Sequence, residues 1–203
     1  MIETITADYG RLDVLVNNAG GGPPVAAATA SPSLTQKIIA LNLVAPMVLS
    51  QQAHAALAAG EQPGVIINIA SVSGVRPSPG SAAYGAAKAG IWGFHNCLWQ
   101  EGKKHNIRSF VLAPVAHTRL TEDLPGFQAE AMKQRMEPGL VSPLVVYLAS
   151  DLAKEYTGKT FFVGGGRIAE MRMVRAEGAT KSGGGGLWTP REISDRIGEI
   201  LLP

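Results

Sequence analysis

One tyrosine and one lysine stand four positions apart in the otherwise small-residue segment SAAYGAAKAG, residues 81–90. On a helix, Tyr84 and Lys88 would share one face. A phenol has a pKa of about 10, but a cation about 4 Å away at an effective dielectric near 20 contributes roughly 4 kcal/mol, or about three pKa units, in favour of the phenolate. The pair could therefore serve general acid–base catalysis. The alternative is an exposed lysine and a half-buried tyrosine on an ordinary helix.

Two further polar residues could belong to the same reaction centre. Ser71 stands 13 residues before Tyr84, directly after the apolar run VIINIA, and could hydrogen-bond the substrate oxygen that Tyr84 serves. Asn42 lies inside the apolar segment IALNLVAP, where an amide needs a polar partner or a buried water. Taken by itself, Asn42 is also explained as a structural amide that satisfies backbone groups. The motif NNAG, residues 17–20, follows the preceding apolar run.

The elements that must position these residues alternate along the chain. Short apolar runs predict strands at 12–16, 65–70, 108–113 and 160–163, and longer alanine-rich segments predict helices over 33–59, 81–104 and 140–150. This alternation predicts an α/β fold with a parallel, doubly wound sheet covered on both faces. In such a sheet, ligands bind beyond the carboxyl ends of the strands. Those ends carry NNAGGG, SVSG, PVAHT and GGG.

The end of the chain has a different composition. The run SGGGG, residues 182–186, is typical of a flexible joint. After it, Thr189 is a good N-cap, Pro190 suits the first helical position, and isoleucines recur at helical spacing, which predicts a short C-terminal helix. We therefore expect a domain over residues 1–166 and an extension over 167–203.

Composition excludes several classes of function. Eighteen basic and sixteen acidic residues are scattered over the chain, which argues against a nucleic-acid or membrane-surface partner. The single cysteine, Cys97, excludes an internal disulfide and favours a reduced, cytoplasmic location. No run approaches the roughly 20 apolar residues of a membrane span, and the first 20 residues carry charges. The four histidines show no metal-ligand spacing, so we assign them to surface or packing and expect no metal site.

Together these motifs resemble the short-chain dehydrogenase/reductase family over nearly the whole chain. NNAG, an asparagine in the next helix, a serine at a strand end, YxxxK 13 residues later and a proline after the following strand stand in the family's order. The resemblance implies a Rossmann-like fold and hydride transfer between NAD or NADP and a small-molecule alcohol or carbonyl. It also implies a homodimer or homotetramer formed through the helices at 33–59 and 81–104.

The same resemblance implies roles for individual residues. Tyr84 would be the general acid/base, Ser71 would polarise the carbonyl or alcohol, and Lys88 would lower the phenol's pKa and bind the nicotinamide ribose. Asn42 would hold a water in a proton relay from Lys88. Cofactor contacts would come from Tyr84 and Lys88 and from the loops after two strands, namely Asn18, Ala19, Gly20, Pro114, Val115 and Thr118, with Asn17 supporting the sheet.

A narrower resemblance lies in VLAPVAHTRLTEDLP, YTGKTFFVGGGRIAEMR and the tail LWTPREISDRIGEIL. These segments are similar to the branch that contains the dehydrogenase part of peroxisomal multifunctional enzyme type 2 and its bacterial single-domain relatives. The branch implies a 3-hydroxyacyl-CoA or a similar secondary alcohol as substrate, with NAD favoured over NADP.

The sequence departs from the family pattern at two places. Pro114 is followed by Val115 instead of glycine, so Thr118 is either a cofactor contact or a cap before a lid over residues 121–138; that lid segment is equally well explained as a solvated loop. The second departure is at the start. The family places three strands and the glycine-rich turn GxxxGxG, which seats the pyrophosphate, before the strand at 12–16. We therefore expect an N-terminally truncated domain with a bare apolar edge at that strand.

Two functions follow from these expectations. The first is an oxidoreductase of the short-chain type. The alternative is a non-catalytic fragment or pseudoenzyme that retains only the oligomerising helices.

Overall fold

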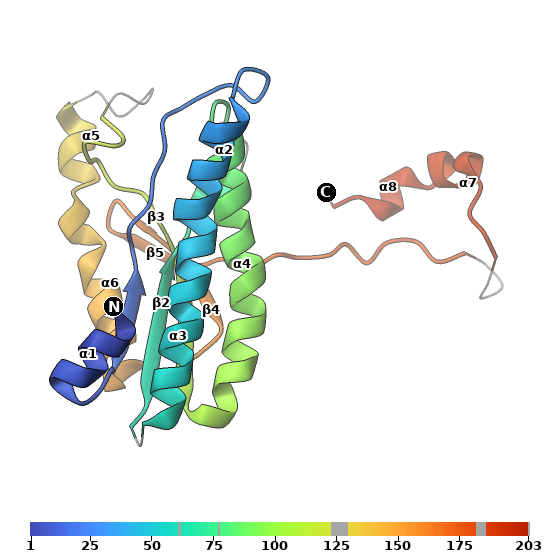
Figure 1. The fold of residues 1–203 in the computed structure, drawn as a ribbon. Helices are drawn as coiled ribbons and strands as arrows, with labels where there is room; N and C mark the ends of the chain where they lie inside the picture. The colour runs from blue at the N-terminus through green and yellow to red at the C-terminus, as the bar shows by residue number, and fades with distance from the viewer. Residues whose placement is uncertain (61, 77, 123–129, 182–185, 203) are drawn as a thin grey trace. The chain divides into compact units, whose positions relative to one another are not determined.

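The computed structural model describes residues 1–60, 62–76, 78–122, 130–181 and 186–202. A five-stranded sheet in the order β1-β2-β3-β4-β5 lies at the centre of its first unit, Met1–Met171 (Figure 1). The strands are β1 (Val14–Asn17), β2 (Gly64–Ile69), β3 (Ile107–Pro114), β4 (Lys159–Gly164) and β5 (Arg167–Glu170). The first four pair in parallel, and β5 pairs antiparallel with β4.

Helices cover both faces of this sheet (Figure 1). On one face lie α1 (Ile2–Tyr9), α2 (Pro32–Ile39), α3 (Ala45–Ala59) and α4 (Ala82–Gly102), and on the other lies α6 (Ser142–Ala149), which follows the short α5 (Glu130–Arg135). The β2 side chains alternate accordingly: Ile66 packs with α3, whereas Val65 and Ile67 pack with α6. This alternation explains why apolar residues occupy successive positions in the inner strands.

The α/β fold class predicted from the sequence is confirmed. All four predicted strands and the three predicted helices form, with ends shifted by one or two residues. The fifth strand was not predicted. Gly165 and Gly166 adopt left-handed φ angles of 59° and 75°, which make a tight two-residue turn and fold Arg167–Glu170 back onto β4. The sheet therefore has five strands, where four were expected, and the expected domain boundary at residue 166 lies inside this hairpin.

The helix predicted over 33–59 has an irregularity at its middle. Between α2 and α3 the chain forms a π-helical turn, η1 (Ala40–Val44), so that Pro32–Ala59 is one continuous helix. By length and composition this helix reaches what a membrane span needs, contrary to the expectation from the sequence. In the structure it packs against α1, α4 and the strands β1 and β2, which accounts for its buried apolar residues Ile38, Ala53 and Leu57.

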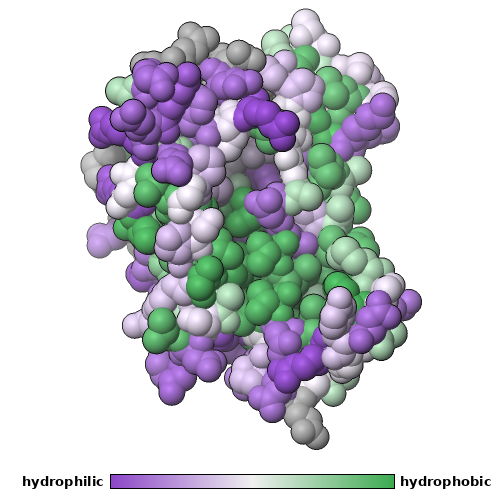
Figure 2. Space-filling model, turned by 90° about the vertical axis from the view of Figure 1, so that its left-hand side faces the viewer, coloured by the Kyte–Doolittle hydropathy of each residue, from purple (hydrophilic) through white to green (hydrophobic). Residues whose placement is uncertain are grey.

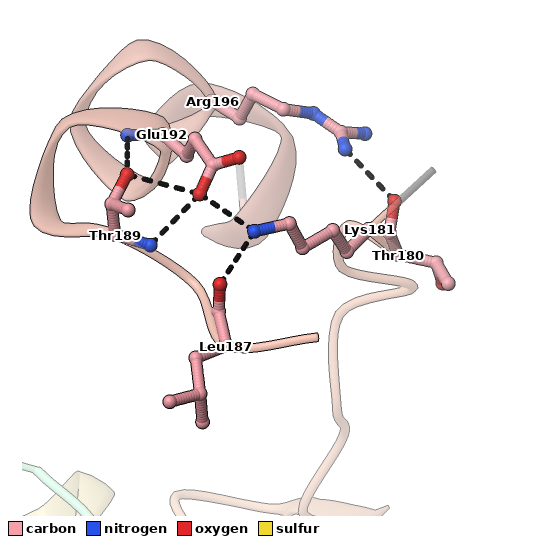
Figure 3. A network of polar contacts seen from close by, with 6 residues as sticks. All are labelled: Thr180, Lys181, Leu187, Thr189, Glu192 and Arg196. Atoms are coloured by element: carbon pink, nitrogen blue, oxygen red, sulfur yellow. Dashed lines mark hydrogen bonds and ion pairs between the residues drawn. The ribbon is translucent and has the colours of Figure 1, made fainter. Parts of the chain in front are cut away.

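The second unit, Arg172–Pro203, contains α7 (Pro190–Asp195) and α8 (Ile197–Ile200). The predicted N-cap at Thr189 is confirmed: its side chain accepts a hydrogen bond from the Glu192 N–H, and Glu192 accepts from the Thr189 N–H at 2.8 Å (Figure 3). The Lys181 ammonium lies 2.9 Å from the Glu192 carboxylate. Hydrogen bonds from the Thr189 backbone and from Lys181 lower the pKa of Glu192 to about 2.

Two predicted segments fall partly outside the described residues. The expected lid includes residues 123–129, and α5 is the described part of it. The expected glycine joint includes residues 182–185.

Candidate active site

Tyr84 and Ser71 meet at the carboxyl end of β2. Tyr84 lies in the first turn of α4, and Ser71 follows β2 and caps the short 3-10 turn η2 (Val72–Gly74), accepting a hydrogen bond from the Ser73 N–H at 3.2 Å. Burial raises the pKa of the Tyr84 phenol, and the hydrogen bond with Ser71 lowers it by a smaller amount. The serine is therefore placed to act on the same oxygen that exchanges a proton with Tyr84.

Lys88 is buried one helical turn further along α4, at 3 % exposure. Its ammonium donates a hydrogen bond to the Ile69 carbonyl at 2.7 Å and lies 5.6 Å from the centroid of the Tyr84 ring. Burial lowers the pKa of Lys88 to about 8. An ammonium has three N–H donors, and Ile69 is its one acceptor among the described residues, so two donors are left for a ligand.

The expected lowering of the phenol's pKa by Lys88 stays a prediction. The sequence predicted that the cation lowers the pKa of Tyr84, but burial raises that pKa. Burial is the larger cause of the shift, and the hydrogen bond with Ser71 opposes it. At neutral pH the phenol therefore keeps its proton and is a proton donor.

Asn42 completes the group from the π-helical turn. Its side-chain amide binds the Gly21 backbone twice, accepting from the N–H and donating to the carbonyl at 2.8 Å each, and it also donates to the Ile38 carbonyl at 2.9 Å. Its side chain is fully buried, and both of its N–H donors have acceptors. The contacts therefore show the structural role that the sequence left open, in which Asn42 satisfies backbone groups. The proton relay stays a prediction.

Gly20 joins Asn42 to Lys88. A β-carbon at Gly20 would lie 2.7 Å from the Asn42 Oδ1 and 3.2 Å from the Lys88 Nζ. Only glycine allows the loop after β1 to approach this closely. The NNAG motif therefore reaches the lysine through backbone, and the four predicted catalytic residues form one cluster with Gly20.

Asn17, the first residue of NNAG, supports the sheet. The Asn17 side chain donates to Asn68 at 2.8 Å and to Ser50 at 2.9 Å, which joins β1, β2 and α3 through buried amides. Asn18 makes a backbone hydrogen bond to the Val16 carbonyl at 3.1 Å. Sequence analysis assigned a supporting role to Asn17 but did not identify Ser50 and Asn68.

The loop after β3 carries the remaining predicted cofactor contacts. Pro114 ends the strand, and the Val115 N–H donates to the Val163 carbonyl at 2.9 Å. The Thr118 hydroxyl accepts from the Leu120 N–H at 3.2 Å, which is the capping role weighed in the sequence. A β-carbon at Gly21 would lie 3.4 Å from the Leu120 side chain, so this loop reaches the NNAGGG loop. A contact between Thr118 and a cofactor stays a prediction.

The cluster fits the nicotinamide end of a dinucleotide. The two remaining Lys88 donors suit the hydroxyls of a ribose, and the Gly20 backbone leaves room beside them. In the part of the chain that the structure describes, no glycine run after a strand leads directly into a helix: Gly20–Gly22 precede α2 by ten residues, and Gly165 and Gly166 turn into β5. The described residues also contain no group of three acidic, histidine or cysteine side chains that could hold a metal.

Comparison with known proteins agrees with this geometry. A sequence model of the short chain dehydrogenase family matches residues 1–125. The chain belongs to this family, whose members are NAD(P)-dependent oxidoreductases.

Three similar proteins illustrate the relationship. Peroxisomal multifunctional enzyme type 2 of Mus musculus is 34% identical over 201 residues, which are 98% of this chain and 26% of that protein. The 3-oxoacyl-[acyl-carrier-protein] reductase of Synechocystis sp. is 35% identical over 173 residues, 83% of this chain and 70% of the reductase. The crystal structure of a short chain dehydrogenase from Mycobacterium avium superposes with a TM-score of 0.84 at 34% identity, covering 100% of this chain and 70% of that one. The chain spans 20% to 43% of the length of the peroxisomal proteins it matches.

Proposed function

We propose that this chain carries the acid–base centre of an NAD(P)-dependent oxidoreductase acting on a 3-oxoacyl or 3-hydroxyacyl thioester. The observation that carries the proposal is the cluster of the buried Lys88 with the half-buried Ser71 and Tyr84, in which Ser71 lies beside a protonated phenol and lowers its pKa. A nicotinamide cofactor would supply the hydride. The residues of this chain would supply the proton and the polar surroundings of the substrate oxygen.

The protonation states favour carbonyl reduction at neutral pH. Tyr84 would donate its proton to the substrate oxygen as hydride reaches the carbonyl carbon, and Ser71 would hold that oxygen in place. The resulting phenolate would be stabilised by the nearby Lys88 ammonium, whose pKa of about 8 allows it to return a proton. Oxidation of the alcohol needs the phenolate at the start and is therefore expected to be favoured at higher pH.

The thioester substrate is supported by the relatives. Two of the similar proteins are named as a peroxisomal multifunctional enzyme type 2 and a 3-oxoacyl-[acyl-carrier-protein] reductase. The match to the peroxisomal protein covers 98% of the chain and so includes its second unit. This coverage favours the CoA thioester over the carrier-protein form, in agreement with the tail motif in the sequence.

Self-association is part of the proposal. The apolar side chains Leu41, Val44 and Val48 are between 43% and 48% exposed along the helix Pro32–Ala59. A homo-oligomer formed through this helix would remove them from water.

The first experiment measures cofactor binding and turnover. NADH and NADPH are titrated into the 203-residue protein by fluorescence, and reduction of acetoacetyl-CoA is then followed by loss of cofactor absorbance. We expect saturable binding of one cofactor below the millimolar range. No saturable binding of either cofactor would contradict the proposal and favour the non-catalytic alternative.

Tyr84→Phe tests the proposed proton donor. The change removes the hydroxyl and keeps the ring, so we expect turnover of acetoacetyl-CoA to fall by about 100-fold or more while the cofactor dissociation constant changes little. Tyr147→Phe, on α6 in the other layer, is the matched control and should retain activity. Turnover retained in Tyr84→Phe would refute the assigned role.

A further inference from the structure

Two glycines lie where the turn η2 touches α4. A β-carbon at Gly85 would lie 2.7 Å from the Ser73 carbonyl oxygen, and one at Gly74 would lie 2.8 Å from the Ala89 nitrogen and 2.9 Å from the Lys88 carbonyl carbon. Real β-carbons do not approach atoms this closely. The backbone of η2 therefore rests directly on the backbone of α4, with one contact beside Tyr84 and the other beside Lys88.

Gly85 lies inside a helix, where glycine lowers the stability of the helix. It is less favourable than alanine there, because it loses more backbone freedom on folding. The same helix contains Gly93, around which a β-carbon would meet nothing within 4 Å. Both glycines lie in α4, but only Gly85 is in contact with the backbone of another segment. Gly93 is therefore the matched control.

Ser73 connects Gly85 to the acid–base pair. Its carbonyl faces Gly85, while its N–H donates to the Ser71 hydroxyl oxygen at 3.2 Å. A hydrogen bond with the Ser71 side chain in turn lowers the pKa of Tyr84. A displacement of Ser73 away from α4 therefore moves the group that orients the Ser71 hydroxyl.

We infer that Gly85 and Gly74 are positioning residues, which set the distance between the Ser71 and Tyr84 side chains by letting η2 lie against α4. The inference rests on the proposed function, in which this hydrogen bond orients the proton donor. Neither glycine touches substrate, because each acts through the backbone of η2 or α4. The distance between Ser71 and Tyr84 thus depends on direct contact between the η2 backbone and the α4 backbone, with no side chain between them.

The test compares Gly85→Ala and Gly74→Ala with Gly93→Ala. Phenol ionisation is followed by ultraviolet absorbance, with the matching Tyr84→Phe protein subtracted so that only Tyr84 is seen. Since the Ser71 hydrogen bond lowers the pKa of Tyr84, both glycine variants at the contact should raise its ionisation midpoint, and Gly93→Ala should leave it unchanged. Turnover with acetoacetyl-CoA should fall on the order of 10- to 100-fold in kcat, with KM within about twofold.

A second comparison separates positioning from general loss of packing. In a Ser71→Ala background the hydrogen bond is already absent, so Gly85→Ala should shift the Tyr84 midpoint little further. An equal shift in both backgrounds would overturn the inference. The inference would also be overturned if the Gly85→Ala and Gly74→Ala proteins fold and keep the natural ionisation midpoint and kcat. If neither variant folds, the glycines are needed for folding, and the inference is overturned as well.

The two measurements keep this inference distinct from the proposed function. If the natural protein shows no turnover, the proposed function fails, while the ionisation midpoint of Tyr84 still reports whether Gly85 and Gly74 place Ser71 against it.

Discussion

Buried polar side chains, taken one by one, determine what this domain can do. Lys88 and His95 lie on the same helix and are 3% and 1% exposed. Lys88 donates one hydrogen bond to the Ile69 carbonyl and has two further N–H donors for a ligand in the reaction centre. His95 hydrogen-bonds Ser109 at 3.1 Å in the core. Sequence analysis identified Lys88 by its spacing from Tyr84. It assigned the histidines to surface or packing, and for His95 the structure shows packing with full burial.

His95 predicts a dependence of stability on pH. Burial lowers its pKa from 6.5 to about 4, so the unfolded chain binds the proton more tightly. The free energy of unfolding should therefore be at its full value above about pH 6.5 and fall as the pH decreases towards 4. The loss amounts to about 3 kcal/mol for this shift.

Urea unfolding of the natural protein and of His95→Gln between pH 4 and 7 measures this effect. The variant lacks the titrating group, and its stability should fall less on acidification. His105→Gln, at an exposed position, is the control and should keep the natural slope. Parallel pH profiles for the natural protein and His95→Gln would contradict the prediction.

At the scale of elements, short irregular segments position the site. The π-helical turn η1 carries Asn42, and the 3-10 turn η2 is capped by Ser71. The sequence predicted one helix over 33–59 and could not show the turn, because residues 40–44 are apolar around Asn42 and have ordinary helical propensities. The hydrogen bonds of Asn42 to Gly21 exist only once the loop after β1 lies against η1.

Asn42→Ala tests how strongly this turn is held. The change leaves the Gly21 N–H and carbonyl without their partner, and we expect it to lower the free energy of unfolding by roughly 2 to 4 kcal/mol. Gln52→Ala, at an exposed position of α3, should change it by less than about 0.5 kcal/mol. Equal decreases in the free energy of unfolding for the two variants, measured with urea, would show that the Asn42 amide does not stabilise this turn.

At the scale of the whole first unit, the two edges of the sheet differ. The strand β5 carries Arg167 and Glu170, and Glu170 pairs with Lys159 at 3.1 Å, so this edge has the charges that keep edge strands apart. The strand β1 reads VLVN and has no charged residue, and Val16 is 39% exposed. Figure 2 shows hydrophobic side chains gathered near the middle of one face of the molecule.

Val16→Lys tests the exposed edge at β1. We expect a lysine there to slow aggregation of the purified 203-residue protein, measured by light scattering over time at a fixed concentration. Ile168→Lys on β5 is the matched control, since Ile168 is 54% exposed on a strand that already carries charges, and it should have a smaller effect. Aggregation of Val16→Lys at the natural rate would contradict the prediction.

Local pattern was enough for much of this protein. Apolar runs and alanine-rich segments determined the parallel sheet and its helices, because their periodicities depend only on neighbours along the chain. The spacing of Ser71, Tyr84 and Lys88 placed them on the end of a strand and one face of a helix, which was sufficient to predict a reaction centre. The Thr189 cap was equally readable, since a capping box spans four consecutive residues.

Tertiary structure decided the properties that depend on residues distant in sequence. The pKa of Tyr84 rises because burial outweighs the hydrogen bond with Ser71. The Asn42 side chain hydrogen-bonds the loop after β1. Gly20, Gly74 and Gly85 are required because a β-carbon at each position would overlap neighbouring atoms. Desolvation and close contact are set by what surrounds a residue in space, and the order of residues along the chain carries no direct record of those surroundings.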